Sequence, residues 1–143
     1  TEEEKMNPWM GALEDNLDVL NPSEHPERGA WGRAATHDLV RSRIRIKSLN
    51  FMRGRTFLNK LLIIDEAQNL TAHQMKTLIT RSGPGSKVVC LGNIAQIDTP
   101  YLTETTSGLT YVVDRFKHWE HSGHVTLQRG ERSRLADYAS EIL

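Results

Sequence analysis

Two adjacent acidic residues follow a short aliphatic run in the middle of the chain. Residues 61–64 are all Leu or Ile, and Asp65 and Glu66 come directly after them. A buried strand that ends in this way holds both carboxylates at one edge of a sheet, where a ligand can reach them. Asp65 would hold Mg²⁺ through water, and Glu66 would orient or deprotonate an attacking water molecule. The pattern indicates half of a nucleoside triphosphatase site, although a strand that simply ends in two solvated acids explains the motif alone about as well.

An amide-bearing segment follows the next predicted strand. Residues 87–91 are largely apolar, and the sequence Gly-Asn-Ile-Ala-Gln occupies positions 92–96. Because the carboxyl ends of parallel strands meet at one edge of a sheet, Gln96 is expected near the two acids, where its amide could contact the terminal phosphate or the attacking water. Gln68 is another candidate for such a contact. In isolation, the segment is more simply interpreted as a turn.

A third polar segment, residues 127–133, follows a short predicted strand at 125–127. An arginine at this position can stabilise charge that develops on a transferring phosphoryl group. Arg132 is the first candidate, because a serine that suits a helix start follows it, and Arg129 is the second. Such an arginine, considered alone, is more often just solvated. The three segments occur in order at the ends of predicted strands, so their chance agreement is much less probable than any single coincidence.

Alternating strands and helices must position these residues, and they predict an α/β fold with a mostly parallel sheet and right-handed crossovers. Asn7 and Pro8 predict the start of the first helix. Thr71 and Gln74 form a capping box for a later one. The other expected elements are a loop at 21–32, a short helix at 33–40, a strand at 43–47, a helix end at 82–85, a helix at 109–116 and a closing helix at 135–142.

Composition limits the class of protein. The chain has 143 residues, of which 38% are hydrophobic, and this predicts one domain over residues 1–143. Basic and acidic residues balance at 18 each, so attraction to nucleic acid has to come from local patches. The lone Cys90 cannot build a disulfide framework, which favours a reducing cytoplasm.

The loop that would cradle the phosphates does not occur in this sequence. It reads G-x-x-x-x-G-K-[ST] between a strand and a helix, and the chain contains no Gly-Lys dipeptide. Residues 83–87 follow a predicted helix and precede a strand, which is the reverse order. We interpret the chain as an excised fragment and expect the loop upstream of Thr1. The fragment alone should bind ATP weakly and not hydrolyse it, and strand edges left open should cause self-association or a rearranged sheet.

These motifs together resemble the PhoH-like family of ATP-binding proteins, whose nucleotide domain is similar to superfamily 1 helicase cores. The resemblance is carried by residues 3–17, 49–71, 92–102, 107–113 and 127–139. It implies a partial RecA-like P-loop NTPase fold, ATP and Mg²⁺ as ligands, and a link to RNA. Longer relatives of this subtype carry a PIN ribonuclease domain ahead of the PhoH portion, so we expect a parent protein that couples ATP-dependent RNA unwinding to RNA processing.

The same resemblance suggests a role for each matching residue. Asp65 and Glu66 match the family's Walker B acids. Asn93 stands where the family usually has Asp, and if that acid tunes the water or the metal, hydrolysis would be weakened here without loss of binding. We expect catalytic roles for Glu66, Gln96 and Arg132, and nucleotide contacts from Asp65, Gln68, Asn93 and Arg129.

A basic stretch without acids covers residues 41–60. It could contact RNA phosphates or a neighbouring subunit of a homo-oligomer. The alternative is a solvated edge strand whose positive charge deters strand pairing, and the two explanations are about equal. A rival hypothesis is a binding or assembly module, in which the nucleotide site is a switch, Asn93 signals weak catalysis and the basic stretch holds RNA or another subunit. The expected contact residues are Arg43, Arg45, Arg53 and Arg55.

Overall fold

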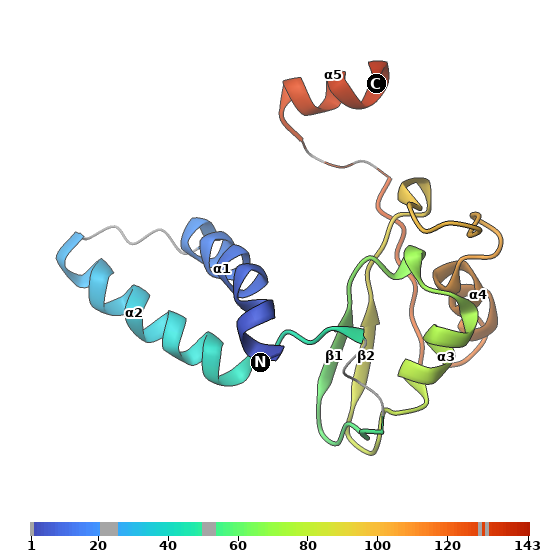
Figure 1. The fold of residues 1–143 in the computed structure, drawn as a ribbon, viewed down its shortest axis with the longest axis horizontal. Coiled ribbons are helices and arrows are strands. Elements are labelled where there is room, and N and C mark those ends of the chain that lie inside the picture. Colours follow the sequence, from blue (N-terminus) through green and yellow to red (C-terminus); the bar gives the residue numbers. More distant parts are fainter. Residues whose placement is uncertain (1, 21–25, 50–53, 129, 131) are drawn as a thin grey trace. The chain divides into compact units, whose positions relative to one another are not determined.

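The computed structural model describes residues 2–20, 26–49, 54–128, 130 and 132–143 (Figure 1). The chain divides into two compact units, Thr1–Arg55 and Thr56–Leu143. The first unit contains the helices α1 (Glu2–Leu20) and α2 (Pro26–Arg43). The second contains the elements β1 (Leu61–Ile64), η2 (Ala67–Asn69), α3 (Ala72–Ile79), β2 (Lys87–Cys90), η3 (Ile94–Gln96), α4 (Gly108–Phe116) and α5 (Arg134–Ile142), where η denotes a 3₁₀ helix.

The first unit is a pair of helices joined by an ion pair. The guanidinium of Arg41 on α2 donates from Nε to Oε1 of Glu14 on α1 at 2.5 Å, and from Nη2 to Oε2 at 3.1 Å. The side chain of Glu14 is 10% exposed and that of Arg41 is 62% exposed. The hydrogen bond from Arg41 lowers the pKa of Glu14. Val40 is the buried apolar side chain among the described residues of this unit.

The predicted start of the first helix is wrong. Asn7 does not cap α1, because the helix begins at Glu2 and Pro8 lies inside it. Proline in a helix costs one backbone hydrogen bond. The described acidic residue Glu4 lies in the first turn, where a negative charge interacts favourably with the helix dipole, and this is consistent with the earlier start.

The predictions of a loop at 21–32 and a strand at 43–47 are also corrected. Residues 26–32 belong to α2, while 21–25 lie outside the described residues. Pro26, which suggested a loop, instead occupies the first position of the helix, where proline needs no N–H partner. Residues 44–48 form no strand, since α2 runs through Arg43 and Ile44 still donates to Val40 O at 2.7 Å.

The second unit has the expected parallel arrangement. β1 pairs with β2 in parallel, with Leu61, Leu62, Ile63 and Ile64 opposite Lys87, Val88, Val89 and Cys90. The predicted capping box of α3 is confirmed, since Thr71 Oγ1 accepts from Gln74 N and Gln74 Oε1 accepts from Thr71 N. The helices predicted at 109–116 and 135–142 are confirmed as α4 and α5.

The core of the second unit lies where α3, α4 and η2 meet beside β1. Its buried apolar side chains are Ile64, Ala67, Leu70, Met75 and Leu78. Figure 1 shows α3 and α4 on the same side of the sheet. The alternation along β1 agrees with this, because Ile64 is buried whereas Leu61 and Ile63 are 62% and 57% exposed.

The strand predicted at 125–127 is wrong. These residues are irregular, and Val125 and Leu127 are exposed. A strand needs a partner, and in the described part of the chain the sheet consists of β1 and β2 alone. None of the helices among the described residues is both long and apolar enough to cross a membrane.

Candidate functional site

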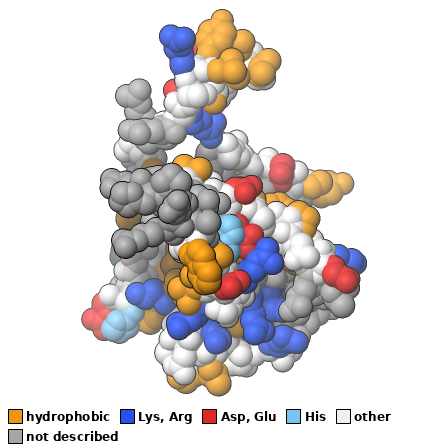
Figure 2. Space-filling model, turned by 90° about the vertical axis from the view of Figure 1, so that its left-hand side faces the viewer, with side chains coloured by type: hydrophobic (Ala, Val, Ile, Leu, Met, Phe, Trp, Pro, Cys, Tyr) orange, Lys and Arg blue, Asp and Glu red, His pale blue; other side chains and the backbone are white. Residues whose placement is uncertain are grey.

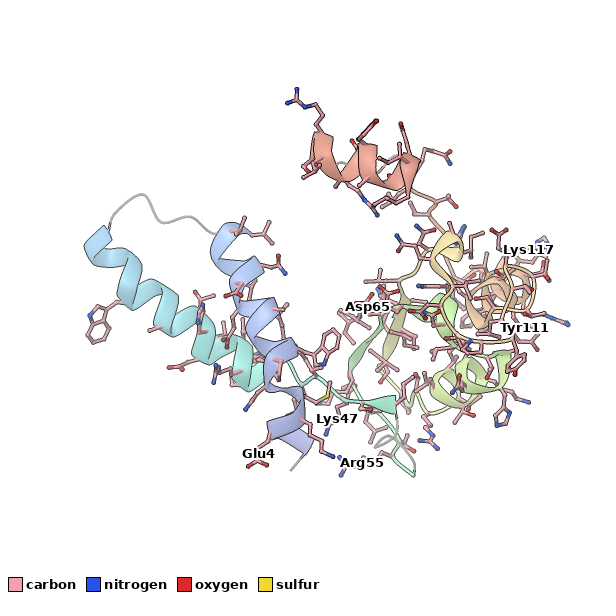
Figure 3. The ribbon with its side chains drawn as sticks, turned by 45° about the horizontal axis from the view of Figure 1, so that its top comes forward. Glu4, Lys47, Arg55, Asp65, Tyr111 and Lys117 are labelled. Atoms are coloured by element: carbon pink, nitrogen blue, oxygen red, sulfur yellow. The ribbon has the colours of Figure 1, made fainter. Side chains whose placement is uncertain are left out.

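The carboxyl ends of β1 and β2 bring the first two polar segments together. Asp65 and Glu66 follow β1 directly, and Asp65 is labelled at this end of the strand in Figure 3. Residues 91–96 follow β2. Backbone hydrogen bonds join the two turns, from Leu91 N to Ile64 O and from Ala67 N to Leu91 O, both at 2.9 Å. The predicted proximity of the acidic pair and the amide segment is therefore confirmed.

Glu66 has a left-handed backbone at this turn. Its φ and ψ are 51° and 37°, which lie in a region that costs a residue with a Cβ about 1–2 kcal/mol. The conformation is held on both sides, because Glu66 N donates to Asp65 Oδ1 at 2.9 Å and Glu66 O accepts from Asn69 N at 3.0 Å. Such local strain persists where the surroundings fix the backbone. Here it turns the chain sharply from β1 into η2 and leaves both acids exposed.

Gln68 connects the two turns through its side-chain amide. Its Nε2 donates to Glu66 Oε2 at 2.5 Å and to the backbone oxygen of Gln96 at 3.2 Å. Its Oε1 accepts from Asn93 N at 3.2 Å. The residue is fully buried, with 0% of its surface exposed. The predicted site residues on the two turns are thus linked by one internal amide.

Two neighbouring residues at the start of α4 hold the backbone of Gln68 and η2. Ser107, also fully buried, donates from Oγ to Gln68 O at 2.8 Å. Gly108 follows it, where a Cβ would lie 2.6 Å from Leu70 O and 2.7 Å from Thr71 O. Only a glycine allows the start of α4 to approach η2 so closely. The sequence analysis did not identify Ser107 and Gly108 as supports of the site, and their Ser-Gly pair before an apolar helix signals a helix start without revealing this contact.

A second amide holds the segment farther along the chain. Asn69 Oδ1 accepts from Asp98 N at 2.9 Å and from Thr99 N at 3.3 Å. Thr99 Oγ1 donates to Asn69 O at 3.1 Å. Residues 68 and 69 therefore fix the segment 93–99 at successive points, but of their two side chains only that of Gln68 also hydrogen-bonds the carboxylate of an acid at the candidate site.

Asn93 and Gln96 lie on the surface of the second turn. The Oδ1 of Asn93 accepts from Ala95 N at 3.0 Å and so caps η3. Asn and Asp cap helices about equally well, so this local role suits either residue. Gln96 is exposed, and its backbone oxygen accepts from the same Gln68 nitrogen that donates to Glu66.

The residues present fit a magnesium ion that is bound together with a nucleotide. Mg²⁺ is commonly held by one or two carboxylates, with phosphate oxygens and water completing its shell. Asp65 offers one exposed carboxylate at a fixed strand end. The described residues contain no group of three or more His, Cys, Asp or Glu side chains that could hold a metal by themselves. Asp65 would thus hold the ion, and phosphates would supply further oxygen ligands.

Arg132, the candidate arginine of the third segment that the structure describes, makes no hydrogen bond or ion pair with the described residues of this site. Arg132 is exposed just before α5, and it makes no ion pair with another described residue. Arg129 lies outside the described residues. The prediction that an arginine reaches the phosphates stays a prediction.

The basic stretch 41–60 divides into residues with different environments. Arg41 is engaged by Glu14, whereas Arg43, Arg45 and Arg55 are exposed. The stretch contains Arg53, which lies outside the described residues. Figure 2 shows exposed Lys and Arg side chains and exposed acidic side chains on the face turned toward the viewer. That face carries both signs of charge.

Comparison with known proteins gives a consistent result. The sequence is 45% identical over 141 residues to Protein PhoH2 of Bacillus subtilis, covering 99% of this chain and 31% of that protein. It is 40% identical over 116 residues to a PhoH-like protein of Mycobacterium leprae, covering 80% of this chain and 30% of that protein. The chain thus spans about a third of the length of these relatives. No solved structure matches it.

A family model extends this similarity to nearly the whole chain. The model described as PhoH-like protein matches residues 1–142. The match includes both turns at the carboxyl ends of β1 and β2, and the parallel α/β arrangement agrees with a partial P-loop NTPase domain. The chain belongs to the PhoH-like protein family.

Proposed function

We propose that this chain forms the magnesium-binding and water-activating side of an ATP site in a full-length protein that binds and hydrolyses ATP. PhoH-like proteins are in general ATP-binding proteins. One observation carries the proposal: Asp65 and Glu66 lie at the same sheet edge as Asn93 and Gln96, and hydrogen bonds join the two turns. In α/β proteins, nucleotides bind in the crevice outside the carboxyl ends of parallel strands.

Each residue has a chemical task in this proposal. Asp65 would hold Mg²⁺ through water. Glu66 accepts a proton from the attacking water while the water oxygen bonds to the terminal phosphorus and the bond from this phosphorus to the ADP oxygen breaks. Gln96 contacts the terminal phosphate or that water. Arg132 contacts the transferring phosphate. Asn93 and Arg129 contact the nucleotide.

The test compares Glu66→Gln with Glu141→Gln in the full-length protein. Glu141 is a matched control because it is an exposed glutamate on α5. Removal of a general base typically slows a reaction by about 10²–10⁴-fold. Glu66→Gln should therefore lower kcat by at least about 10²-fold, with little change in ATP affinity. The control should retain turnover. Normal turnover in Glu66→Gln would refute the role of Glu66, and absence of ATP hydrolysis in the wild-type protein would refute the proposed activity.

Residues 1–143 alone should behave differently from the full-length protein. Their sequence contains no G-x-x-x-x-G-K-[ST] segment, whose backbone amides would hold the β- and γ-phosphates. Calorimetric titration with Mg²⁺ and ATP should therefore detect weak binding or none. Tight magnesium-dependent binding would contradict this expectation.

The finer biological setting belongs to the same proposal. We expect the full-length protein to act in the cytoplasm, to couple ATP hydrolysis to RNA unwinding or processing, to carry a PIN ribonuclease domain and to form homo-oligomers. Exposed Arg43, Arg45 and Arg55 support contact with RNA, and the exposed apolar residues Leu61 and Ile63 support self-association.

A second candidate is a binding or assembly module whose nucleotide site acts as a switch. The exposed arginines of the basic stretch favour it. In that case RNA affinity should fall steeply with salt, and the double variant Arg43→Glu and Arg45→Glu should weaken binding and flatten its salt dependence. RNA affinity that changes neither with salt concentration nor in the double variant would exclude this candidate.

A further inference from the structure

Gln68 is the most deeply enclosed polar side chain at the candidate site. All of its surface is buried, and both ends of its amide make hydrogen bonds. A Cβ added to Gly92 would lie 2.5 Å from Gln68 Oε1, so the chain fits tightly around the amide. A side chain enclosed in this way has no surface to offer a nucleotide. Its contacts with the protein therefore define what it can do.

The partners of Gln68 also fix the orientation of its amide. The carboxylate of Glu66 needs a donor and the N–H of Asn93 needs an acceptor, so Nε2 has to face the first and Oε1 the second. A buried amide is costly to leave without hydrogen bonds. The reverse orientation would place two acceptors together and two donors together. The observed arrangement is the one in which every contact is favourable.

We propose that Gln68 is a positioning residue that holds the carboxylate of Glu66 and the turn 93–96 in one fixed arrangement. The bond from Nε2 to Glu66 involves a charged acceptor, and such bonds are stronger than neutral ones. The same nitrogen donates to Gln96 O, and Oε1 holds Asn93 N. The Gln68 amide therefore sets where the water-activating carboxylate lies relative to the residue that contacts the terminal phosphate. This role rests on the function proposed for Glu66.

Asn69 provides a matched control on the adjacent position. Its side-chain amide also anchors the segment that follows β2, through Asp98 N and Thr99 N. The Asn69 side chain makes no hydrogen bond with Glu66 among the described residues, and the backbone bond from Asn69 N to Glu66 O would remain after the side chain is removed. A purely structural role predicts similar effects of removing either amide. A positioning role predicts that only the loss of Gln68 impairs the chemical step.

The main experiment measures ATP hydrolysis by the full-length protein with Gln68→Met and Asn69→Ala. Methionine keeps nearly the volume of glutamine and removes its hydrogen bonds. Displacement of a catalytic group by about 1 Å can cost roughly 10²-fold, so Gln68→Met should lower kcat by about 10–100-fold while KM and the Kd for ATP change by less than about threefold. Asn69→Ala should keep kcat within about threefold of the wild-type value.

A second variant reaches the same contact from the other side. Gly92→Ala keeps the glutamine at position 68 but adds a methyl group that would displace its Oε1. It should lower kcat in the same way if the position of the amide matters. Amide hydrogen exchange at Asn93 supplies a readout that does not depend on activity, because this N–H donates to Gln68 Oε1. Exchange at Asn93 should be at least about tenfold faster in the Gln68→Met variant than in the wild-type protein. The same difference should appear when the variant and the wild-type sequence are compared in residues 1–143 alone, if that chain is folded.

The outcomes separate this proposal from the proposed function. If Glu66→Gln abolishes turnover while folded Gln68→Met and Gly92→Ala turn over ATP as the wild-type protein does, the positioning role is overturned. The proposed ATPase activity is then unaffected. Equal losses of kcat in Asn69→Ala and Gln68→Met would also overturn it, because they would indicate a general structural effect. Absence of hydrolysis in the wild-type protein would overturn the proposed function, and the role of Gln68 with it.

Discussion

The two compact units differ in how their described residues are held together. In Thr1–Arg55, the buried side chains are Val40 and Glu14, and the ion pair between Glu14 and Arg41 joins the helices. In Thr56–Leu143, a cluster of apolar side chains is closed by the fully buried polar residues Gln68 and Ser107. One unit depends on a partly exposed charge contact, and the other on a packed core.

This difference explains why the candidate site lies in the second unit. A group that activates water has to keep its position closely, and packed surroundings restrict its motion. Glu66 sits on a strained turn whose neighbours Ala67 and Gln68 are both fully buried. The exposed acids thus rest directly on the core. The helices of the first unit provide no such support for a site among their described residues.

The largest expected effect tests the core of the second unit. Met75 is a fully buried residue of α3. Replacement of a buried Met by Ala typically lowers the free energy of unfolding by about 2–5 kcal/mol. Met75→Ala should therefore lower the free energy of unfolding of this unit by that amount, measured by denaturant titration with the amide NMR signals of α3 and β2. Leu135→Ala on α5 is the control, since Leu135 is 78% exposed and should cost less than about 1 kcal/mol. Equal costs would contradict the distinction between core and surface.

A smaller effect is expected from the ion pair of the first unit. The pKa of Glu14 is lowered from its ordinary value of 4.5 by the hydrogen bond from Arg41. Because the folded pKa is the lower one, the carboxylate stabilises the helix pair above about pH 4.5, and this contribution is lost as the pH falls through the folded pKa. The protection factors of the amides in α1 and α2, which compare exchange with the intrinsic rate at each pH, should therefore fall in acid below that pH.

The variant Glu14→Gln isolates the contribution of this carboxylate. It should exchange faster than the wild-type chain at neutral pH and should lose most of the acid dependence below pH 4.5. An unchanged acid response in Glu14→Gln would show that the ion pair does not hold the helices together.

Sequence reasoning succeeded where neighbouring residues decide the structure. The capping box of Thr71 and Gln74 and the aliphatic runs of β1 and β2 act within a few residues, and each was placed correctly. The adjacent ends of the two strands followed from the rule for parallel sheets. These features fixed the location of the acids and of Gln96 in advance.

It failed where distant contacts or competing local signals decide. The alternating residues 43–47 suggest a strand, but no partner strand is available among the described residues and the preceding helix extends instead. Pro26 suggested a loop and in fact begins a helix. The burial of Gln68 could not be predicted, because its partners Asn93 and Gln96 are 25 and 28 residues away. The D-E-A-Q motif identified the residue without indicating its contacts.

The smallest expected effect concerns Asn93, a position at which the resemblance to the family leads us to expect Asp. Its Oδ1 caps η3 and its N–H donates to Gln68 Oε1, and an Asp at this position would keep both contacts together with the nucleotide contact proposed above. Asp caps as well as Asn, so Asn93→Asp should change stability by less than about 0.5 kcal/mol, whereas Asn93→Ala should cost about 1 kcal/mol. The kcat of the full-length protein should stay within about threefold in Asn93→Asp. A tenfold rise would instead show that an acid at this position acts on the water or the metal, and that Asn93 limits hydrolysis in this chain.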